Sequence, residues 1–282
     1  MSVMPATPTP TLSRRHSAGA ASARGLLFTV LGEFVLPAGG RAWTSACIEV
    51  LSRLGVEQKA TRQALTRTAA DGWLSSERVG RRTCWRLTSA AERLLDDGTR
   101  RIYGFAGAAT EWDGQWVLVL VRTPETERAT RHVLRTRLRW AGLGNPTPGV
   151  WLGTHPERVG EVERVLAGAG VDDAQIFVGA RQSHGDLRAM ARQAWDLDAI
   201  EQGYEAFTAS FAHRGGGDPL TDVVELVHAW RRFPWTDPLL PGTLLPSPWT
   251  GVAAAQLFTC LHDRWSGAAQ QEWAALNESD DG

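Results

Sequence analysis

Cationic and amide side chains recur at helical spacing between Glu57 and Ala70. In an α-helix, one face of this segment would carry Lys59, Arg62, Gln63, Thr66, Arg67 and Ala70. An arginine can bind O6 and N7 of guanine with two hydrogen bonds, and a glutamine can bind N6 and N7 of adenine. The face has three cations and no carboxylate, whereas an ordinary solvated face mixes both signs. The pattern therefore favours a helix that reads base edges over a merely exposed helix.

A second cationic group follows at the turn of a predicted β-hairpin. Arg78, Arg81 and Arg82 crowd this turn, and Gly80 permits a tight backbone conformation. Such a tip would lie along phosphates or enter the minor groove, although a hairpin tip that only improves solubility remains the alternative. Contacts of this kind position a protein on DNA and make its binding depend on salt. Trp73 and Trp85 flank the hairpin and are expected to pin it to the helix at 57–70.

The elements that must position these side chains lie in residues 24–98. Predicted helices cover Leu26–Val35, a segment ending at Leu54, Glu57–Ala70 and a segment ending at Leu95; predicted strands cover Trp73–Arg78 and Thr83–Leu87. Thr44 or Ser45 can cap the second helix, and Thr88 can cap the fourth. The order helix, helix, helix, hairpin is that of a winged helix-turn-helix DNA-binding domain.

Two further blocks follow, and the whole is predicted to be an α+β protein. Residues 99–183 alternate strands (116–121, 150–153, 175–178) with helices (126–141, 157–167), which favours a ferredoxin-like α/β domain, with parallel arrangements still open. Residues 184–282 are mainly helical, with helices over 186–212, over 219–232 and from Thr250, around a proline-rich loop at 234–248. Residues 1–23 are predicted to be a disordered leader, and 277–282 to fray.

Composition limits the function classes. No apolar run approaches the ~20 residues of a membrane-spanning helix, and no apolar core follows Arg14 and Arg15 as in a secretory signal, so a cytoplasmic protein is expected. The net charge is −1, yet residues 24–105 carry 13 Lys+Arg against 8 Asp+Glu (+5), and residues 106–282 carry 15 against 23 (−8). A basic amino-terminal block on an acidic body suits a protein that presents one end to phosphate.

The three cysteines predict neither a disulfide framework nor a metal site. Cys47, Cys84 and Cys260 are far apart and odd in number. Cys260 and His262 form a single pair without a second pair at zinc-like spacing. We expect packed thiols, no metal and no cofactor.

In all three blocks the sequence resembles the PaaX family, the repressors of phenylacetic acid catabolism. The amino-terminal motifs are Leu31-Gly32, Trp43, Leu54-Gly55-Val56, Ala60-Thr61-Arg62-Gln63-Ala64-Leu65, Gly72-Trp73-Leu74, Gly80-Arg81-Arg82 and Trp85-Arg86-Leu87-Thr88, with Arg101-Ile102-Tyr103 at the start of the middle block. The carboxyl-terminal motifs are Arg232-Phe233-Pro234, Asp237-Pro238, Leu240-Pro241, Leu244-Leu245-Pro246 and Trp249-Thr250-Gly251. These matches follow the family order over residues 24–276.

The resemblance implies a cytoplasmic homodimeric regulator, usually a repressor, that binds double-stranded DNA and responds to an acyl-CoA thioester such as phenylacetyl-CoA. It also implies that the middle domain is similar to a CRISPR-associated nuclease, which has an Asp at the end of its first strand. Here the strand 116–121 is followed by Arg122-Thr123, so the catalytic position is lost and no enzyme is expected. A metal-dependent nuclease remains the alternative, and a protein-interaction adaptor is a third class that the acid-free face disfavours.

Candidate effector residues follow from the same resemblance. The segment 126–141 carries a stripe of Arg128, Arg131, Arg135 and Arg139, which could hold the phosphates of an acyl-CoA. It could instead be a solvated face paired with Glu125 and Glu127, or it could lie on DNA. Arg231, Arg232 and Trp235 form a second candidate group. For a homodimer, two-fold symmetry predicts inverted-repeat half-sites.

Overall fold

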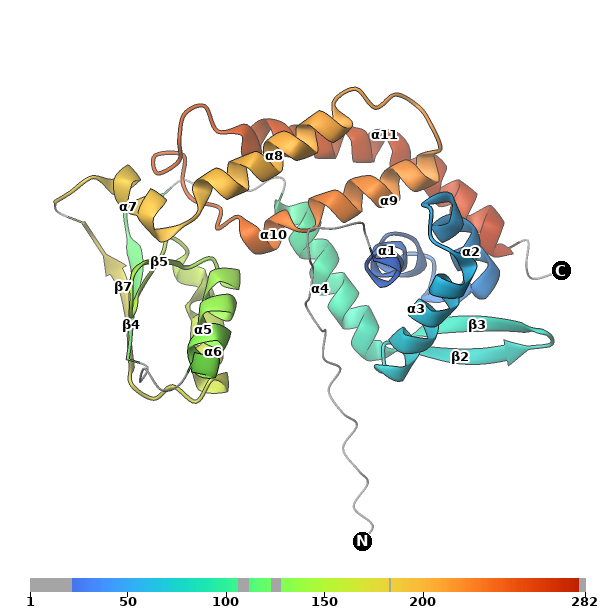
Figure 1. The fold of residues 1–282 in the computed structure, drawn as a ribbon, viewed down its shortest axis with the longest axis horizontal. Coiled ribbons are helices and arrows are strands. Elements are labelled where there is room, and N and C mark those ends of the chain that lie inside the picture. The colour runs from blue at the N-terminus through green and yellow to red at the C-terminus, as the bar shows by residue number, and fades with distance from the viewer. Residues whose placement is uncertain (1–21, 106–111, 123–127, 183, 279–282) are drawn as a thin grey trace, which may run out of the picture. The chain divides into compact units, whose positions relative to one another are not determined.

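The computed structural model describes residues 22–105, 112–122, 128–182 and 184–278, and is an α+β protein (Figure 1). The predicted disordered leader lies outside these residues, except for Ser22 and Ala23, which begin the first helix. No helix in the described ranges is long and apolar enough to cross a membrane.

The chain forms two compact units that do not follow sequence order. One comprises residues 1–103, 214–229 and 258–282, and the other comprises residues 104–213 and 230–257. This division differs from the three consecutive blocks expected, because residues 184–282 are shared between both units.

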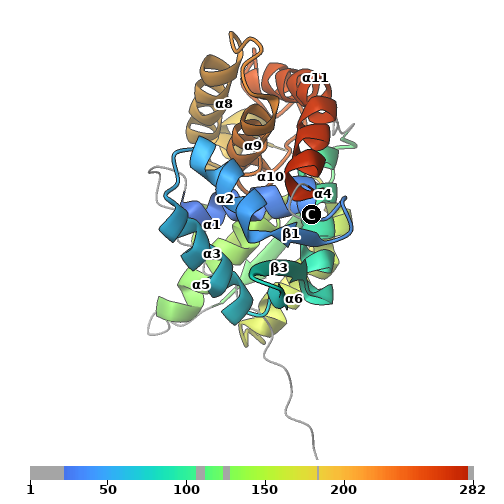
Figure 2. The ribbon, with the colours of Figure 1, turned by 90° about the vertical axis from the view of Figure 1, so that its right-hand side faces the viewer.

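The first unit begins with helices around a small sheet. Its elements are α1 (Ala23–Val30), which continues as a π-helix (Leu31–Val35), β1 (Arg41–Trp43), α2 (Thr44–Arg53), α3 (Gln58–Ala70), β2 (Leu74–Val79), β3 (Arg82–Leu87) and α4 (Ser89–Phe105). The three strands form an antiparallel sheet in the order β1-β3-β2. Figure 2 shows α2 and α3 beside this sheet. The strand β1 is not among the strands predicted for this segment. The predicted cap of the fourth helix is confirmed, since the Thr88 hydroxyl accepts a hydrogen bond from Ala91 N at 3.3 Å at the start of α4.

Carboxyl-terminal residues complete this unit. The helices α9 (Pro219–Trp230) and α11 (Thr250–Glu278) supply most of them. Trp273 of α11 is fully buried and stacks on Phe34, with ring centroids 5.8 Å apart. The Asn277 side chain accepts a hydrogen bond from Trp43 N at 2.9 Å and donates one to Arg41 O at 3.2 Å. The prediction that the chain frays from residue 277 was therefore wrong for Asn277; residues 279–282 lie outside the described residues.

The second unit is built on a four-stranded sheet. Its strands are β4 (Trp116–Val121), β5 (Gly144–Thr147), β6 (Val150–Gly153) and β7 (Ala174–Ala180), in the order β5-β6-β4-β7, with all neighbours antiparallel. The helices α5 (Arg128–Trp140) and α6 (Val159–Gly168) pack on one face through a core that includes Val119, Leu138 and Val162. A parallel sheet, which the sequence had left open, does not form from these strands, and β5 was not predicted.

Helices α7 (Leu187–Ala194), α8 (Leu197–Phe211) and α10 (Phe233–Thr236) complete this unit. The single helix predicted over 186–212 was wrong. Asp196 accepts a hydrogen bond from Ala199 N and thereby starts α8 as a new helix, and the preceding Trp195 leaves helical geometry and is buried. The proline-rich loop is bound to α8, since Tyr204 of that helix donates a hydrogen bond to the buried Asp237 at 2.6 Å.

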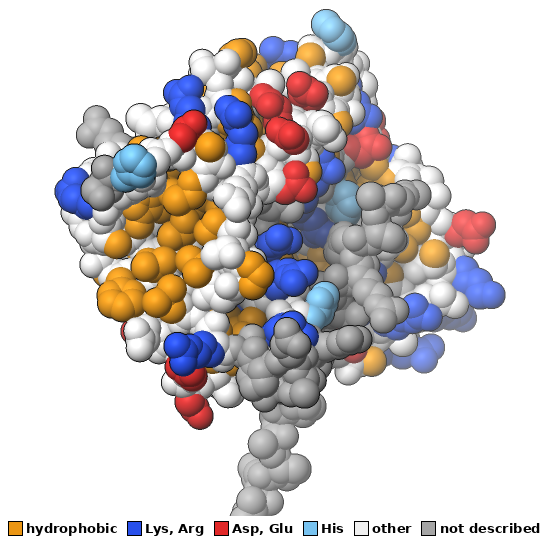
Figure 3. Space-filling model, turned by 60° about the vertical axis from the view of Figure 1, so that its left-hand side comes forward, with side chains coloured by type: hydrophobic (Ala, Val, Ile, Leu, Met, Phe, Trp, Pro, Cys, Tyr) orange, Lys and Arg blue, Asp and Glu red, His pale blue; other side chains and the backbone are white. Residues whose placement is uncertain are grey.

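The other face of the four-stranded sheet leaves apolar side chains uncovered. Leu120 and Phe177 are exposed on β4 and β7, with Phe177 46% exposed. Figure 3 shows a group of hydrophobic side chains on the side of the molecule that carries this sheet.

Candidate nucleic-acid interface

The helix α3 separates into the two faces that its periodicity predicts. Exposed side chains include Lys59, Arg62, Gln63, Thr66 and Arg67, which are all of the predicted reading residues on this helix. Thr61, Ala64, Leu65 and Thr68 are buried on the opposite side. The Thr66 hydroxyl donates a hydrogen bond to Arg62 O, one turn earlier in the same helix, at 2.9 Å. The structure therefore places three cations and one amide together on a solvent-facing helix surface without an intervening acid.

Small buried residues hold α3 close to its neighbours. Thr68 donates its hydroxyl to Ala64 O at 2.7 Å, so the buried face has no unsatisfied hydroxyl at this position. Leu65 is fully buried where α3 meets α1 and α2. Gly55, with φ of 78°, makes the sharp turn between α2 and α3, which a residue with a side chain adopts only with strain. The exposed face of α3 thus rests on a tightly packed support.

The cysteines of this unit behave as packing groups. Cys47 on α2 and Cys84 on β3 are both buried and free. Burial, with a smaller contribution from Cys84, raises the pKa of the Cys47 thiol to about 12. A thiol with so high a pKa stays protonated and unreactive near neutral pH.

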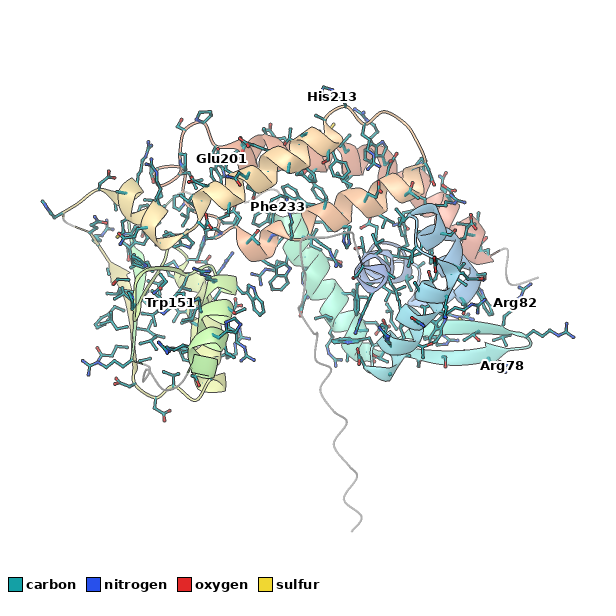
Figure 4. All side chains as sticks on the ribbon, viewed as in Figure 1. Arg78, Arg82, Trp151, Glu201, His213 and Phe233 are labelled. Atoms are coloured by element: carbon teal, nitrogen blue, oxygen red, sulfur yellow. The ribbon has the colours of Figure 1, made fainter. Side chains whose placement is uncertain are left out.

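The hairpin tip is a two-residue turn formed by Gly80 and Arg81. Val79 pairs with Arg82 across it, and Gly80 has φ of 61°. Arg78, Arg81 and Arg82 are all exposed, and Figure 4 shows Arg78 and Arg82 projecting near the tip. Each strand extends one residue further into the turn than predicted, β2 begins one residue later, at Leu74, and the three cations lie around the turn as expected.

The predicted anchoring of the hairpin on α3 holds for the backbone of Trp73, which donates its N–H to Thr68 O at 3.1 Å, but not for Trp85. Trp85 donates its indole hydrogen to Thr44 Oγ1 of α2 at 2.9 Å, and Thr44 in turn donates to Thr83 O at 2.9 Å. Thr44 is therefore the first residue of α2 and does not cap it; the cap position is taken by Trp43, which makes no side-chain cap bond. Trp73 packs edge-on against Phe28 of α1. The side chains of these tryptophans therefore contact α2 and α1, and the backbone of Trp73 is bound to α3.

A shallow hollow of about 410 Å³ lies where α2, α3 and the hairpin meet. Its lining includes Ser45, Gln58, Arg62, Arg81 and Arg82, together with one acid, Glu49, which is paired with Arg53 at 3.0 Å. Because the first turn of a helix has free backbone N–H groups and a positive dipole end, the start of α2 adds anion affinity to that of the arginines. With three arginines against one acid in its lining, the hollow is net cationic and lies beside the exposed face of α3. Ser45 and Gln58 were not predicted as site residues, although their place in first helical turns was a usable signal.

Comparison with known proteins identifies the family. This chain is 30% identical over 272 residues to "Transcriptional repressor PaaX" of Escherichia coli (strain K12), an alignment that covers 90% of this chain and 84% of that protein. The chain belongs to the PaaX family. Three family descriptions match successive segments: "PaaX-like protein" over residues 22–91, "PaaX protein central Cas2-like domain" over 109–191, and "PaaX-like protein C-terminal domain" over 195–275.

A solved structure has the same fold. "Uncharacterized protein Rv0674 from Mycobacterium tuberculosis" superposes with a TM-score of 0.60 at 23% identity, covering 91% of this chain and 99% of that one. At this identity the likeness speaks to the PaaX fold alone.

The end of β4 is the position at which the PaaX resemblance implies a lost catalytic Asp. This strand ends at Val121, and the next residue, Arg122, is exposed. A carboxylate, which the nuclease alternative needs at this point, is replaced by a cation; Thr123 lies outside the described residues. Among the residues that the structure describes, no three His, Cys, Asp or Glu side chains are grouped so that they could hold a metal ion.

The candidate effector residues of this PaaX member fall into different environments. Arg231 is partly buried, and burial lowers the pKa of its guanidinium to about 10. Arg232 donates to Gly203 O at 3.0 Å and lies over the Phe233 ring, so it holds α8 against α10. Trp235 is 39% exposed.

The other effector candidates lie on α5, which contacts α10 within the second unit. Arg131 is partly buried and Arg135 is exposed. The side chain of Arg128, and both acids proposed to pair with this stripe (Glu125 and Glu127), lie outside the described residues.

Proposed function

We propose that this chain is a transcriptional repressor whose residues 24–98 form a winged helix-turn-helix. The observation that carries this is the acid-free exposed face of α3 beside the cationic tip of the β2–β3 hairpin. In this proposal Lys59, Arg62, Gln63, Thr66 and Arg67 face the major groove, and Arg78, Arg81 and Arg82 contact the flanking backbone. The element order and the three-stranded sheet support the assignment, and so does the E. coli repressor that aligns with most of this chain.

The second unit fits a ferredoxin-like domain, because its strand order and two helices on one face agree with that fold. In the proposal it belongs to a homodimer, since a two-fold protein matches an inverted-repeat operator with half-sites about one helical turn, or a multiple, apart. A repressor acts on chromosomal DNA, so we retain the cytoplasmic location for this protein.

We infer that the regulated genes serve the breakdown of phenylacetate or a related aromatic acid, and that an acyl-CoA thioester such as phenylacetyl-CoA releases the repressor. The α10 region supports this, because Arg231 bears a desolvated charge that an anionic group would stabilise, and Trp235 offers an exposed aromatic face nearby in sequence. The thioester must prefer the free protein to the DNA-bound one. A 100-fold preference corresponds to about 2.7 kcal/mol.

Selection of binding sites from fragmented genomic DNA by the purified protein, with and without phenylacetyl-CoA, tests this function. We expect an inverted repeat beside genes of aromatic acid breakdown, and its loss when the thioester is added. An operator that the thioester does not release would preserve the repressor and refute the ligand. Failure to enrich any sequence would refute the repressor and favour a protein-interaction adaptor.

A further inference from the structure

Among the helices that the structure describes, the one with the most cations belongs to the second unit. The helix α5 has the sequence RATRHVLRTRLRW, with five arginines and no acid in 13 residues. It belongs to residues 106–282, a block with 15 Lys+Arg against 23 Asp+Glu, so a third of its cations are concentrated in one helix. The recognition helix α3 has only three cations over the same length.

The arginines of α5 point in more than one direction, and two of them, Arg135 and Arg139, lie on its solvent-exposed side. Leu134 and Leu138 are buried in the core beneath the helix. Arg135 and Arg139, four residues apart, are exposed on the outer side together with His132. Arg137 is also exposed, but helical spacing turns it away from that pair, and its guanidinium lies near Gly168 of α6.

The exposed arginines of α5 have no acid to balance them within the described part of the chain. Neither Arg135 nor Arg139 forms an ion pair or a side-chain hydrogen bond there. Like charges four residues apart on a helix destabilise it. The arrangement therefore carries a cost for the free protein that a row of phosphates would relieve.

We propose that the outer face of α5, formed by His132, Arg135 and Arg139, is a second DNA contact that binds backbone phosphates. Four residues of α-helix rise about 6 Å, and one DNA strand has a charge about every 3.4 Å along its axis, so the two arginines can engage phosphates about two positions apart. Backbone phosphates are the same in every sequence, so arginines that bind them contribute affinity without base preference. This inference rests on the proposed function, since it needs DNA as the ligand.

The test compares Arg135→Ala/Arg139→Ala with the control Arg137→Ala, which removes an exposed arginine from the same helix. Affinity for an operator duplex and for a scrambled duplex is measured over a salt series. We expect the double variant to bind both duplexes about ten-fold more weakly at low salt. The slope of log K against log [salt] should become shallower by about 1.8, that is, about 0.9 for each lost contact. The ratio of operator to scrambled affinity should not change.

Two outcomes would overturn the proposal. One is an unchanged salt slope in the double variant; the other is unchanged DNA binding with weakened release by phenylacetyl-CoA, which would assign α5 to the phosphates of the thioester. The variant Arg135→Gln/Arg139→Gln, which keeps polar side chains, and thermal unfolding of each protein separate charge loss from unfolding. If the wild type binds all DNA equally and the slope still falls, the α5 contact stands and the sequence-specific repressor fails.

Discussion

Two exposed cationic helices in this chain differ in how they are built. The helix α3 mixes Lys59, Arg62 and Arg67 with Gln63 and Thr66, whereas α5 exposes arginines and a histidine. Beneath α3 lie alanine and threonine side chains, and beneath α5 lie leucines on a sheet. In the proposed function, an amide reads a base edge only when it is held at a fixed distance from it, and the small residues under α3 allow the close packing that fixes this distance. Charge alone suffices for phosphate, and α5 has that.

The largest effect is expected from removing the support of α3. Leu65 is the one large side chain on its buried face, and Leu65→Ala should lower the free energy of unfolding by about 2–5 kcal/mol. Denaturant unfolding measures this. Leu138→Ala, under α5, is the matched control: it should cost a similar amount, yet the folded variant should keep its sequence preference. A loss below 1 kcal/mol for Leu65→Ala would mean that α3 does not depend on this packing.

A smaller and more specific loss is expected from Arg62→Ala. If Arg62 binds a guanine with two hydrogen bonds, its removal should weaken operator binding by about 1–3 kcal/mol and relax specificity at one base pair. Competition with a library of single-base operator variants at fixed salt measures both effects. Equal weakening on operator and scrambled DNA would make Arg62 a phosphate contact and reduce the contrast with α5. Unchanged operator affinity would remove Arg62 from the interface.

The hairpin tip should behave like α5 and unlike α3. Arg81→Ala removes one exposed cation at the two-residue turn, so we expect a uniform loss on all duplexes and a salt slope shallower by about 0.9. Titration of operator and scrambled duplexes over a salt series measures this. A change in base preference would show that the tip enters the minor groove and reads its A·T content.

The smallest effect is expected in the reactivity of the cysteines. This reactivity also reports whether the packing beneath α3 is intact in the other variants. At pH 8 iodoacetamide should label one thiol, Cys260, in the folded protein and three after denaturation. Because the pKa of the Cys47 thiol is raised in the folded protein, the buried thiol favours folding as long as it stays protonated, and deprotonation of Cys47 favours the unfolded chain. Stability should therefore fall as the pH rises above the ordinary thiol range toward about 12. Rapid labelling of Cys47 in Arg62→Ala would reveal an opened support rather than a lost contact.

The exposed face of α3 could be predicted because a helix of period 3.6 sorts its own side chains without help from distant residues. The hairpin was predictable for the same local reason, since Gly80 marks its turn. The strand β1 was not, because three residues carry no periodicity and its partner β3 lies about 40 residues further along the chain. Thr44 looked like a helix cap but satisfies Trp85 instead. In each missed case a tertiary partner decided the local structure.

The clamp between Asn277 and the edge of β1 bears on how the protein is made. During translation, residues 24–98 leave the ribosome before Trp273 and Asn277 have been synthesised. Until then, the edge of β1 and the Phe34 side chain lack their contacts with α11. An open strand edge is a template for pairing with other chains. A chain that lacks Trp273 and Asn277 therefore leaves the edge of β1 and the Phe34 side chain without these partners.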